Sequence, residues 1–258
     1  MAEILNNIIV NGSQISTPKG PEAKLVPAPA PEGGGKYWRQ LDFIDPEKLN
    51  EYAILVAGAG SVGSWATLAL AKMGAQRVTV WDRDIVDLHN ASVQIFSSRE
   101  VGGRKALLLS AWVDRLADNG ARVTAVTRHL DADAGVASID QEILVMAVDS
   151  MPARRYLWDL AKASPKVRLV IDVRMGGEVL RMYAVDPRDP SQEAFYEGNF
   201  YDGGPGEALS CSAQATIYTS MFAAAFVSSV VSSFVSGQPL ENEVVFHTRT
   251  LKIIRGRA

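Results

Sequence analysis

The sequence predicts a doubly wound, Rossmann-like α/β fold, with a mostly parallel sheet and antiparallel strands at its C-terminal edge. Three observations lead to this prediction. An apolar run at 52–57 ends in a G-x-G-x-x-G motif at Gly58, Gly60 and Gly63. Apolar runs and helical patterns then alternate through the first two thirds of the chain, which is typical of parallel strands joined by crossover helices. Near the end, residues 242–256 alternate between apolar and polar side chains, as edge strands do.

The first part of the sheet is predicted from continuous apolar runs, because parallel strands are buried on both faces. "YAILVAGAG" at 52–60 is the first expected strand, and "RVTVWD" at 77–82 is the second. Between them, "SVGSWATLALAKMGA" begins with small residues, carries an apolar face and has Gly74 near its end, so it predicts a helix. A second long helix is predicted at 102–120, where an Asn-Gly pair ends it.

The rest of the chain continues this pattern. Strands are expected at 121–130 and 142–150, a helix at 151–164, two strands around a Gly-Gly turn at 167–187, a long helix within 208–240, and edge strands at 242–256. Residues 1–35 stand apart, because they are rich in proline, alanine and glycine and hold few large apolar side chains. They predict a flexible N-terminal arm, and residues 36–258 predict one compact domain.

The composition narrows the classes of function. The 258 residues carry a formal net charge of −3, whereas general nucleic-acid binding needs a concentrated basic surface, so we expect no nucleic-acid partner. A single cysteine, Cys211, cannot form an internal disulfide or a C-x-x-C zinc site. The sequence opens without the basic and apolar pattern of a secretory signal, and we expect a cytoplasmic protein.

One uncharged segment raises the question of a membrane. Residues 208–240 contain no charged side chain, and the part at 217–237 is long enough to cross a bilayer. That part holds six serines, however, and has no basic or tryptophan anchors at its ends. Apolar helices of this kind also occur inside proteins and at subunit interfaces, so we expect a buried helix and no membrane span.

The glycine motif indicates a site for a nucleotide phosphate. Gly58 permits a tight turn, Gly60 lets phosphate approach the backbone, and Gly63 lets the following helix pack against the strand. The free N–H groups at the start of that helix then face the phosphate. Asp82 ends the second strand, at the spacing after the motif where an acid binds ribose hydroxyls. These features fit any dinucleotide-binding fold, and NAD-dependent oxidoreductases are among them.

The segment after the second strand favours a different chemistry. A dehydrogenase would continue its alternation of helices and strands, whereas here a long polar loop precedes the next helix. The polar residues that we single out are Asn90, Gln94, Arg104 and Lys105, with Asp149 at the end of a later strand. Amide and cationic groups beside a phosphate site, with a carboxylate able to hold Mg²⁺ nearby, indicate phosphate chemistry.

Several motifs together resemble the ThiF/MoeB/HesA family, whose fold is that of the ubiquitin-activating enzymes. Besides the glycine motif, "DLHNASVQ" at 87–94, "VGGRKA" at 101–106 and "AVDSMPARR" at 147–155 carry the resemblance. "KYWRQLDF" at 36–43 is similar to the Tyr-x-Arg-Gln segment with which these proteins open. "LSCSAQAT" at 209–216 is similar to their late cysteine, which precedes an uncharged helix. The resemblance therefore extends from about residue 36 to the C-terminus.

The resemblance implies an adenylyltransferase that depends on ATP and Mg²⁺. Enzymes of this family bind ATP and a carboxylate, usually the C-terminus of a small ubiquitin-like or sulfur-carrier protein, and form an acyl adenylate and pyrophosphate. An ionised carboxylate needs no general base, so such a site mainly aligns the reactants and neutralises charge. The implied partner is a carrier protein or peptide with a free C-terminal carboxylate.

Roles for individual residues also follow from the resemblance. The nucleotide would contact the motif glycines and Gln94, with its ribose at Asp82, while Asn90 and Lys105 would contact phosphates. Asp149 would hold Mg²⁺. Taken singly, each of these residues has an ordinary structural interpretation, such as a strand-end cap, a solvated lysine or a turn amide. Their order and spacing together favour the functional interpretation.

A homodimer is implied in the same way, because Arg39 matches an arginine that reaches the ATP of the partner subunit.

The sequence departs from the family pattern at one position. An arginine usually stands directly before the glutamine that matches Gln94, and this chain has Val93 there. Arg99, Arg104 or Arg174 would have to supply the missing charge. Arg174 is the preferred candidate, since it follows a strand on the expected carboxylate side, although a surface ion pair explains it equally well. The departure leaves open a divergent enzyme or a nucleotide-binding relic.

Cys211 matches cysteines that, in relatives, take up the activated acyl group. It follows a glycine-rich stretch, and the alternative is a small buried residue without chemistry. Two other functions also remain open. One is an NAD-dependent oxidoreductase, which has no use for Lys105 or Asp149, and the other is a non-catalytic scaffold that binds a ubiquitin-like partner.

Overall fold

The computed structural model describes residues 9–10, 13–14, 35–117, 120–128, 139–201 and 215–258. The chain forms two units, Met1–Trp38 and Arg39–Ala258. In the first unit, the two-residue strands β1 (Ile9–Val10) and β2 (Ser13–Gln14) pair antiparallel. Most of the predicted arm at 1–35 lies outside the described residues, and its function as a tether stays a prediction.

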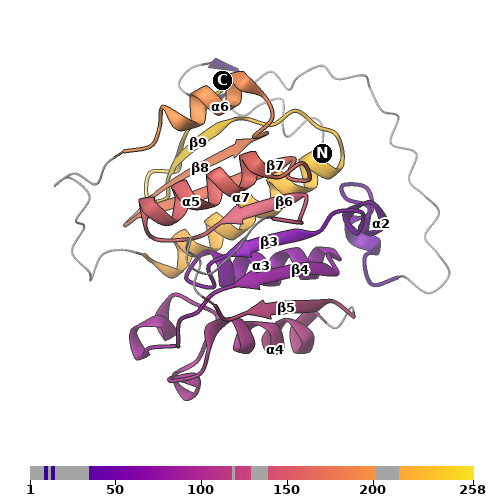
Figure 1. Cartoon of the computed structure of the whole chain (residues 1–258), viewed down its shortest axis with the longest axis vertical. Coiled ribbons are helices and arrows are strands. Elements are labelled where there is room, and N and C mark those ends of the chain that lie inside the picture. The colour runs from indigo at the N-terminus through magenta and orange to yellow at the C-terminus, as the bar shows by residue number, and fades with distance from the viewer. Residues whose placement is uncertain (1–8, 11–12, 15–34, 118–119, 129–138, 202–214) are drawn as a thin grey trace. The chain divides into compact units, whose positions relative to one another are not determined.

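The second unit is built on an eight-stranded sheet with the strand order β10-β9-β8-β7-β6-β3-β4-β5 (Figure 1). The parallel strands are β3 (Ile54–Ala57), β4 (Arg77–Trp81), β5 (Arg122–Val126), β6 (Ile143–Met146) and β7 (Leu169–Gly176). The antiparallel strands are β8 (Val179–Val185), β9 (Glu243–His247) and β10 (Lys252–Gly256). A mostly parallel sheet with antiparallel strands on its C-terminal side was the predicted fold class, and it is confirmed.

The register of the parallel strands brings their carboxyl ends to one level. Ala57 at the end of β3 pairs with Trp81 of β4 on one side and with Met146 of β6 on the other. Met146 in turn pairs with Asp172 of β7. Residues that follow these four positions therefore lie along one edge of the sheet, where ligands of doubly wound folds bind.

Two layers of helices cover the sheet (Figure 1). One core forms against α3 (Gly63–Met73), α4 (Lys105–Ala117) and α7 (Ile217–Val235). The other core forms against α5 (Met151–Ala163) and α6 (Pro190–Glu197). Residues of β7 alternate between them, with Ile171 in the first core and Val170 in the second. This alternation is the two-residue period of a strand, and it decides which side chains share a face with the site.

Local sequence explains where the helices begin and end. Gly74 follows α3 with φ +115°, a left-handed conformation that glycine adopts without steric cost. The Ser150 hydroxyl accepts a hydrogen bond from Ala153 N and caps α5. Asp189 caps α6 in the same way, and Pro190 opens that helix. Helix α6 and the short helix α2 (Pro46–Leu49) were not predicted from the sequence.

The uncharged segment forms α7, which packs one face into the molecule. Ala223, Val227 and Val231 are fully buried in the core shared with α3. The Ser220 and Ser228 hydroxyls donate to carbonyls one turn earlier, so their polar atoms are satisfied within the helix. By length and composition α7 is able to cross a membrane, but core helices of globular proteins pass the same test. A helix that packs inside the protein needs a buried apolar face, and α7 has one, as the sequence predicted.

Candidate functional site

The glycine motif forms a tight turn between β3 and α3. Gly58 has φ +101°, and a Cβ there would lie 2.5 Å from the Ala147 carbonyl oxygen after β6. A Cβ on Gly63 would lie 1.8 Å from the Gly58 carbonyl oxygen. A Cβ on Gly60, by contrast, would meet nothing within 4 Å. Gly58 and Gly63 therefore close the turn against its neighbours, whereas Gly60 borders open space above it.

Helix α3 starts at this turn. Its first turn is anchored where Ser64 N donates to the Gly60 carbonyl at 3.0 Å. The amino end of an α-helix carries N–H groups without intrahelical acceptors and the positive end of the helix dipole. Because that end faces the turn beside Gly60, the local geometry suits an anion such as a phosphate.

Asp82 connects the end of β4 to the glycine turn. Its Oδ2 accepts a hydrogen bond from Ala59 N at 2.7 Å, and its Oδ1 accepts one from Asp84 N at 2.7 Å. Burial raises the pKa of Asp82, and the two N–H donors together with the positive charge of Lys105 offset part of this rise. The carboxylate thus shapes the turn itself, and ribose binding by its remaining lone pairs stays a prediction.

Lys105 lies at the first position of α4 and is largely buried, with 8% of its surface exposed. Its Nζ forms an ion pair of 3.3 Å with Asp84 Oδ2, and its backbone N donates to the Asp84 carbonyl. Asp84 was not singled out in the sequence, and it holds the lysine where β4 ends. The charge of Lys105 also acts on Asp82 at the glycine turn, and its contact with a phosphate there stays a prediction.

The polar loop after β4 folds back onto the start of α3. It contains two short 3-10 helices, Leu88–Ser92 and Ser98–Glu100. Trp65 Nε1 donates to the Val93 carbonyl at 3.0 Å, and Ile95 N donates to Ser64 Oγ at 3.3 Å. These contacts place the loop beside the glycine turn.

Two amide side chains of this loop lie near the turn. Asn90 is buried, and its Oδ1 accepts from Asp87 N at 2.8 Å. The Oε1 atom of Gln94 is buried and has no hydrogen-bond partner in the described part of the chain. Buried amide groups normally find partners, and an unsatisfied amide oxygen requires a donor, such as a hydroxyl or amino group of a nucleotide, rather than a phosphate oxygen. Val93 contributes backbone contacts here, since its carbonyl accepts from Trp65 Nε1 and its N–H donates to the Asn90 carbonyl.

Asp149 follows β6 and is exposed to solvent. The preceding residues pack on the glycine turn, since Ala147 N donates to the Ala57 carbonyl at 2.8 Å and Ala147 closes over Gly58. Asp149 therefore lies beyond the carboxyl end of β6, one strand from the glycine turn, with Lys105 on the far side of that turn. The structure brings the two residues to the same edge of the sheet.

Asp149 offers a single exposed carboxylate at this edge, and its binding of Mg²⁺ stays a prediction. Among the described residues, no group of three or more histidine, cysteine, aspartate or glutamate side chains is arranged to hold a metal. Mg²⁺ commonly takes one or two carboxylates and completes its shell with water and substrate phosphates. A single exposed carboxylate beside a phosphate site fits this mode of binding.

Arg174 is part of a buried polar cluster that also contains Asp172, Arg154 and Tyr196. Asp172 has no exposed surface, and its two oxygens lie 2.9 Å from Arg154 Nε and 2.7 Å from Arg174 Nε. The Tyr196 hydroxyl donates to Asp172 Oδ2 at 2.9 Å. Arg154 also donates to the carbonyls of Val148 and Val173. The cluster connects β7, α5 and α6 to the backbone just before Asp149.

The cluster changes the interpretation of Arg174. A surface ion pair was one expectation, and it is wrong, because only 9% of Arg174 is exposed and its partner is fully buried. Burial lowers the pKa of Arg174 and is the largest single effect, but the charge and hydrogen bond of Asp172 together with Tyr196 and Tyr183 outweigh it, so the pKa is raised overall. Burial, followed by the charge of Asp172, raises the pKa of Tyr196 well above its usual value, so Tyr196 is neutral. Arg154 and Asp172 were not predicted as part of the site.

The other predicted arginines are on the surface. Arg39 and Arg99 are exposed, and neither forms an ion pair with the described residues. Arg104 is exposed as well and donates to the Arg83 carbonyl at 3.2 Å. Cys211 lies outside the described residues.

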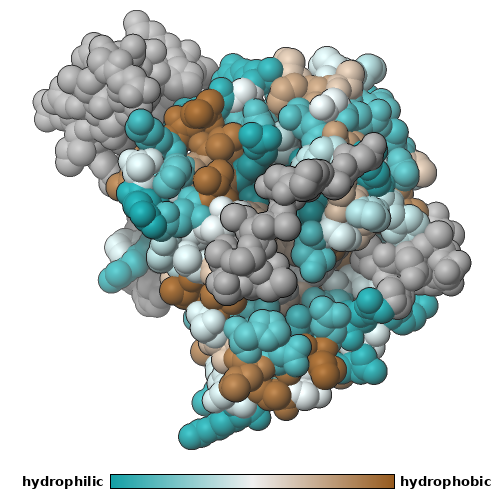
Figure 2. All heavy atoms as spheres, turned by 90° about the vertical axis from the view of Figure 1, so that its left-hand side faces the viewer, coloured by the Kyte–Doolittle hydropathy of each residue, from teal (hydrophilic) through white to brown (hydrophobic). Residues whose placement is uncertain are grey.

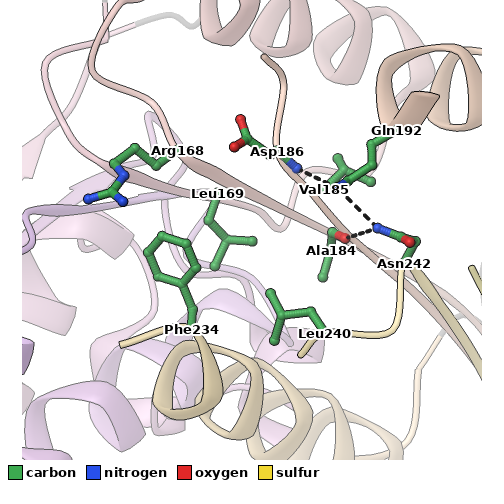
Figure 3. A pocket seen from close by; sticks show the side chains of 9 residues that line it. All are labelled: Arg168, Leu169, Ala184, Val185, Asp186, Gln192, Phe234, Leu240 and Asn242. Atoms are coloured by element: carbon green, nitrogen blue, oxygen red, sulfur yellow. Dashed lines mark hydrogen bonds between the residues drawn. The ribbon is translucent and has the colours of Figure 1, made fainter. Parts of the chain in front are cut away.

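The structure describes part of the surface at this edge of the sheet. Figure 2 faces the carboxyl ends of the parallel strands, and hydrophilic side chains cover much of the described surface there. A small pocket of about 230 Å³ lies elsewhere, between the start of β7 and the end of β8 (Figure 3). Its polar groups bind one another, since Asn242 Nδ2 donates to Gln192 Oε1 at 3.0 Å and to the Ala184 carbonyl at 3.1 Å. It is therefore not the candidate site.

The doubly wound sheet and the glycine turn at its carboxyl edge define a Rossmann-like nucleotide-binding protein. A model of the ThiF family matches residues 37–253, and the chain belongs to this family. The resemblance that the sequence motifs carry is thereby confirmed.

Individual relatives match over shorter stretches. The chain is 33% identical over 129 residues to tRNA threonylcarbamoyladenosine dehydratase of Escherichia coli (strain K12), over 49% of this chain and 47% of that protein. It is 30% identical over 112 residues to adenylyltransferase and sulfurtransferase MOCS3 of Arabidopsis thaliana, over 43% of this chain and 24% of that protein. The alignments thus span less than half of each of these curated relatives.

The structure also resembles a solved one. The crystal structure of Escherichia coli MccB with AMPCPP and selenomethionine MccA matches with a TM-score of 0.70 and 15% identity. The match covers 88% of this chain and 73% of that chain. At this identity the likeness shows the fold alone.

Proposed function

We propose that this protein is an ATP- and Mg²⁺-dependent adenylyltransferase that activates the C-terminal carboxylate of a small ubiquitin-like or sulfur-carrier protein, or of a peptide. One observation carries the proposal: Asp82, Lys105 and Asp149 lie around the glycine turn at one edge of the sheet. Membership of the ThiF family supports it, as does the activity after which the Arabidopsis thaliana relative is named. MccB, which shares the fold, was crystallised with AMPCPP and MccA together.

The proposed reaction joins two anions. A carboxylate oxygen attacks the α-phosphorus of ATP, an oxygen–phosphorus bond forms, and the bond to the bridging oxygen of pyrophosphate breaks. The products are an acyl adenylate and pyrophosphate, and no proton has to be removed from an ionised carboxylate. The main tasks of the protein are therefore to align the reactants and to neutralise charge.

The residues at the edge divide these tasks. Lys105 and the amino end of α3 attract the phosphates, while Asn90 and Gln94 offer amide groups beside them. Asp82 fixes the turn and keeps lone pairs for the ribose. Asp149 would hold Mg²⁺, which supplies charge neutralisation at the phosphates when it is bound.

A homodimer is part of the proposal. Arg39 is exposed and forms no ion pair with the described residues, so it is available to a second subunit. On α7, Tyr218, Met221 and Phe222 are exposed and spaced to share one face of the helix. Exposed apolar side chains gathered in this way are typical of protein interfaces.

Transfer of the acyl group to Cys211 is a further part of the proposal: the thiolate attacks the acyl carbon of the adenylate, a thioester forms, and AMP leaves. The described residues on either side of the segment that carries Cys211 lie beside β7. The Tyr201 ring is 5.7 Å from the Arg174 guanidinium, and Ala215 forms a bridge with Gly177. Cys211 itself lies outside the described residues, and its action near the carboxylate is part of the proposal.

A non-catalytic scaffold is the second candidate. Val93 favours the scaffold, because a valine side chain has no charge with which to bind an ATP phosphate, whereas the family usually has an arginine at this position. Lys105 and Asp149 argue for catalysis, because a scaffold needs neither of them at this edge. The NAD-dependent oxidoreductase loses its main support through the family match.

ATP–pyrophosphate exchange tests the proposal. Wild-type protein is incubated with ATP, Mg²⁺, labelled pyrophosphate and a panel of small carrier proteins that end in Gly-Gly. Exchange that depends on one carrier supports adenylation, and Lys105→Met should reduce it by about 100-fold or more. Lys72→Met, at an exposed lysine on α3, is the matched control and should leave exchange unchanged. ATP binding without exchange for any carrier would favour the scaffold.

A further inference from the structure

Arg174 has a donor that the protein does not use. Its Nε bonds to Asp172, and its Nη1 donates to the Asn199 carbonyl at 2.9 Å. Its Nη2 is buried and has no hydrogen-bond partner in the described part of the chain. Arg154, the other arginine on Asp172, differs because it donates to two backbone carbonyls as well. An unsatisfied buried guanidinium nitrogen is costly, so Nη2 is a donor that requires an acceptor.

The charges around Asp172 indicate that this acceptor is an anion. Arg154 and Arg174 contribute two positive charges, and Asp172 contributes one negative charge. Tyr196 and Tyr183 both have raised pKa values and are neutral, chiefly because they are buried. The cluster therefore holds one positive charge in excess in a region with little water, where an anion is attracted strongly.

Three tyrosine rings lie close to the guanidinium group of Arg174. The guanidinium carbon lies 4.7 Å from the centre of the Tyr183 ring, 5.8 Å from that of Tyr196 and 5.7 Å from that of Tyr201. The guanidinium carbon thus lies over the faces of these rings, at distances typical of cation–π contacts. The edge that carries Nη2 remains for hydrogen bonding, and a carboxylate binds such an edge in the same plane.

The strand order places Arg174 on one particular side of the site. Strand β7 lies next to β6, whose last residue Met146 pairs with Asp172, so Arg174 extends beyond the end of β6. Neighbouring strands are about 5 Å apart. Arg174 is thus one strand from Asp149 but two strands, or about 10 Å, from the glycine turn at which the phosphates are expected.

We propose that Arg174 binds the carboxylate that is to be activated, and that it holds one carboxylate oxygen while the other faces the α-phosphate. This inference rests on the proposed function and deepens it, because it assigns the second substrate to a defined residue. The excess positive charge then reduces the repulsion between the carboxylate and the triphosphate. Asp172 acts as a positioning residue, since it fixes both guanidinium groups.

The test measures a carboxylate and a nucleotide separately. N-acetyl-glycyl-glycine serves as the carboxylate probe, and its C-terminal amide serves as the uncharged reference. Both are titrated by NMR into full-length protein saturated with AMPCPP and Mg²⁺, and the affinity for AMPCPP is measured independently. Wild type should bind the acid at least ten times more tightly than the amide. Arg174→Gln should lose this preference, with its AMPCPP affinity unchanged, whereas Arg174→Lys should keep part of it.

Arg188→Gln is the matched control. Arg188 follows strand β8, is exposed and pairs with Asp186 at 2.7 Å, away from the rings around Arg174. This variant should bind both probes as wild type does.

Several results would overturn the assignment. Equal binding of the acid by wild type and Arg174→Gln would do so, as would no preference of wild type for the acid. A loss of AMPCPP affinity in Arg174→Gln would assign the arginine to the phosphates instead. If Arg174→Gln failed to fold, Arg174→Lys would be compared with wild type in its place. An unchanged preference of Arg174→Lys for the acid over the amide would then overturn the assignment. Acid-selective binding without pyrophosphate exchange would keep the anion site and reject the adenylation reaction.

Discussion

Asp82 Oδ2 accepts a 2.7 Å hydrogen bond from the backbone N–H of Ala59, and this bond joins the end of β4 to the glycine turn after β3. The shape of the turn therefore depends on a carboxylate whose pKa is raised by burial. In such a group the charged form is less stable in the folded protein than in the unfolded chain. The contribution of Asp82 to the free energy of unfolding therefore varies with pH.

Asp82→Asn should remove this pH dependence. Because the folded state binds the Asp82 proton more tightly, wild type loses stability as the pH rises from the usual value of 3.8 through the raised pKa. The difference in unfolding free energy, wild type minus variant, should fall over this interval and then become constant. Loss of one acceptor adds a constant penalty to the variant of about 1–3 kcal/mol.

Urea unfolding at several pH values checks this prediction, with Asp189→Asn as the control. The hydroxyl and N–H of Ser191 lower the pKa of Asp189, so its carboxylate stabilises the fold above the usual pKa. That stability is lost as the pH falls through the lowered pKa. The unfolding free energy of wild type minus that of Asp189→Asn should therefore rise with pH. If the difference in unfolding free energy between wild type and Asp82→Asn also rose with pH, the pKa of Asp82 would be lowered by folding and not raised.

Two glycine substitutions should separate folding from nucleotide binding. Gly58→Ala places a Cβ 2.5 Å from the Ala147 carbonyl oxygen at a positive φ, and we expect it to lower the unfolding free energy by about 1–3 kcal/mol. Gly60→Ala meets no atom within 4 Å and should be as stable as wild type, but its methyl group would occupy the space for phosphate. Urea unfolding and ATP calorimetry measure both effects. Normal ATP affinity in Gly60→Ala would show that phosphate does not approach this position.

Asp149→Asn should raise the Mg²⁺ concentration that supports half-maximal pyrophosphate exchange. The loss of a contact of about 1.4 kcal/mol corresponds to a tenfold change, and we expect at least that. Mg²⁺-dependent binding of AMPCPP should shift by the same factor, which gives a readout without turnover. Asp140→Asn, at an exposed carboxylate that pairs with Lys166 before β6, is the control. Equal Mg²⁺ dependence in the two variants would remove Asp149 from the metal site.

Met221→Glu should dissociate the proposed homodimer. A charge in the exposed apolar face of α7 would be buried on association, and central interface residues contribute about 2 kcal/mol or more. Sedimentation velocity over a range of protein concentrations measures the change. Leu107→Glu, at an exposed apolar position on α4, is the matched control. A wild-type monomer, or equal effects of both variants, would place the interface elsewhere.

Much of the fold could be predicted because its signals are local. Strands β3 and β6 are fully buried, so their sequences are continuous apolar runs, and Gly58 marks the point at which the first of them turns. Helix α6 escaped prediction because it has only eight residues and two large apolar side chains, Phe195 and Tyr196. Its cap, Asp189 before a proline, was a signal that could have found it.

The site was only partly predictable for a related reason. Lys105 and Asp149 stand within short motifs of fixed spacing, whereas Asp172 gains its importance from contacts with a helix before it and a helix after it. One signal was present in the sequence, since a lone carboxylate inside the apolar run of β7 requires a buried partner. The identity of that partner, Arg154, could not be read from spacing along the chain.

The two halves of the proposed site belong to different layers of the molecule. The glycine turn leads into α3 on one face of the sheet, whereas Asp172 and Arg174 contact α5 and α6 on the other. On the proposed chemistry, nucleotide and acyl substrate would enter by separate routes and meet only above β6. Neither would obstruct the other, so the enzyme could accept them in random order and still reach the same ternary complex.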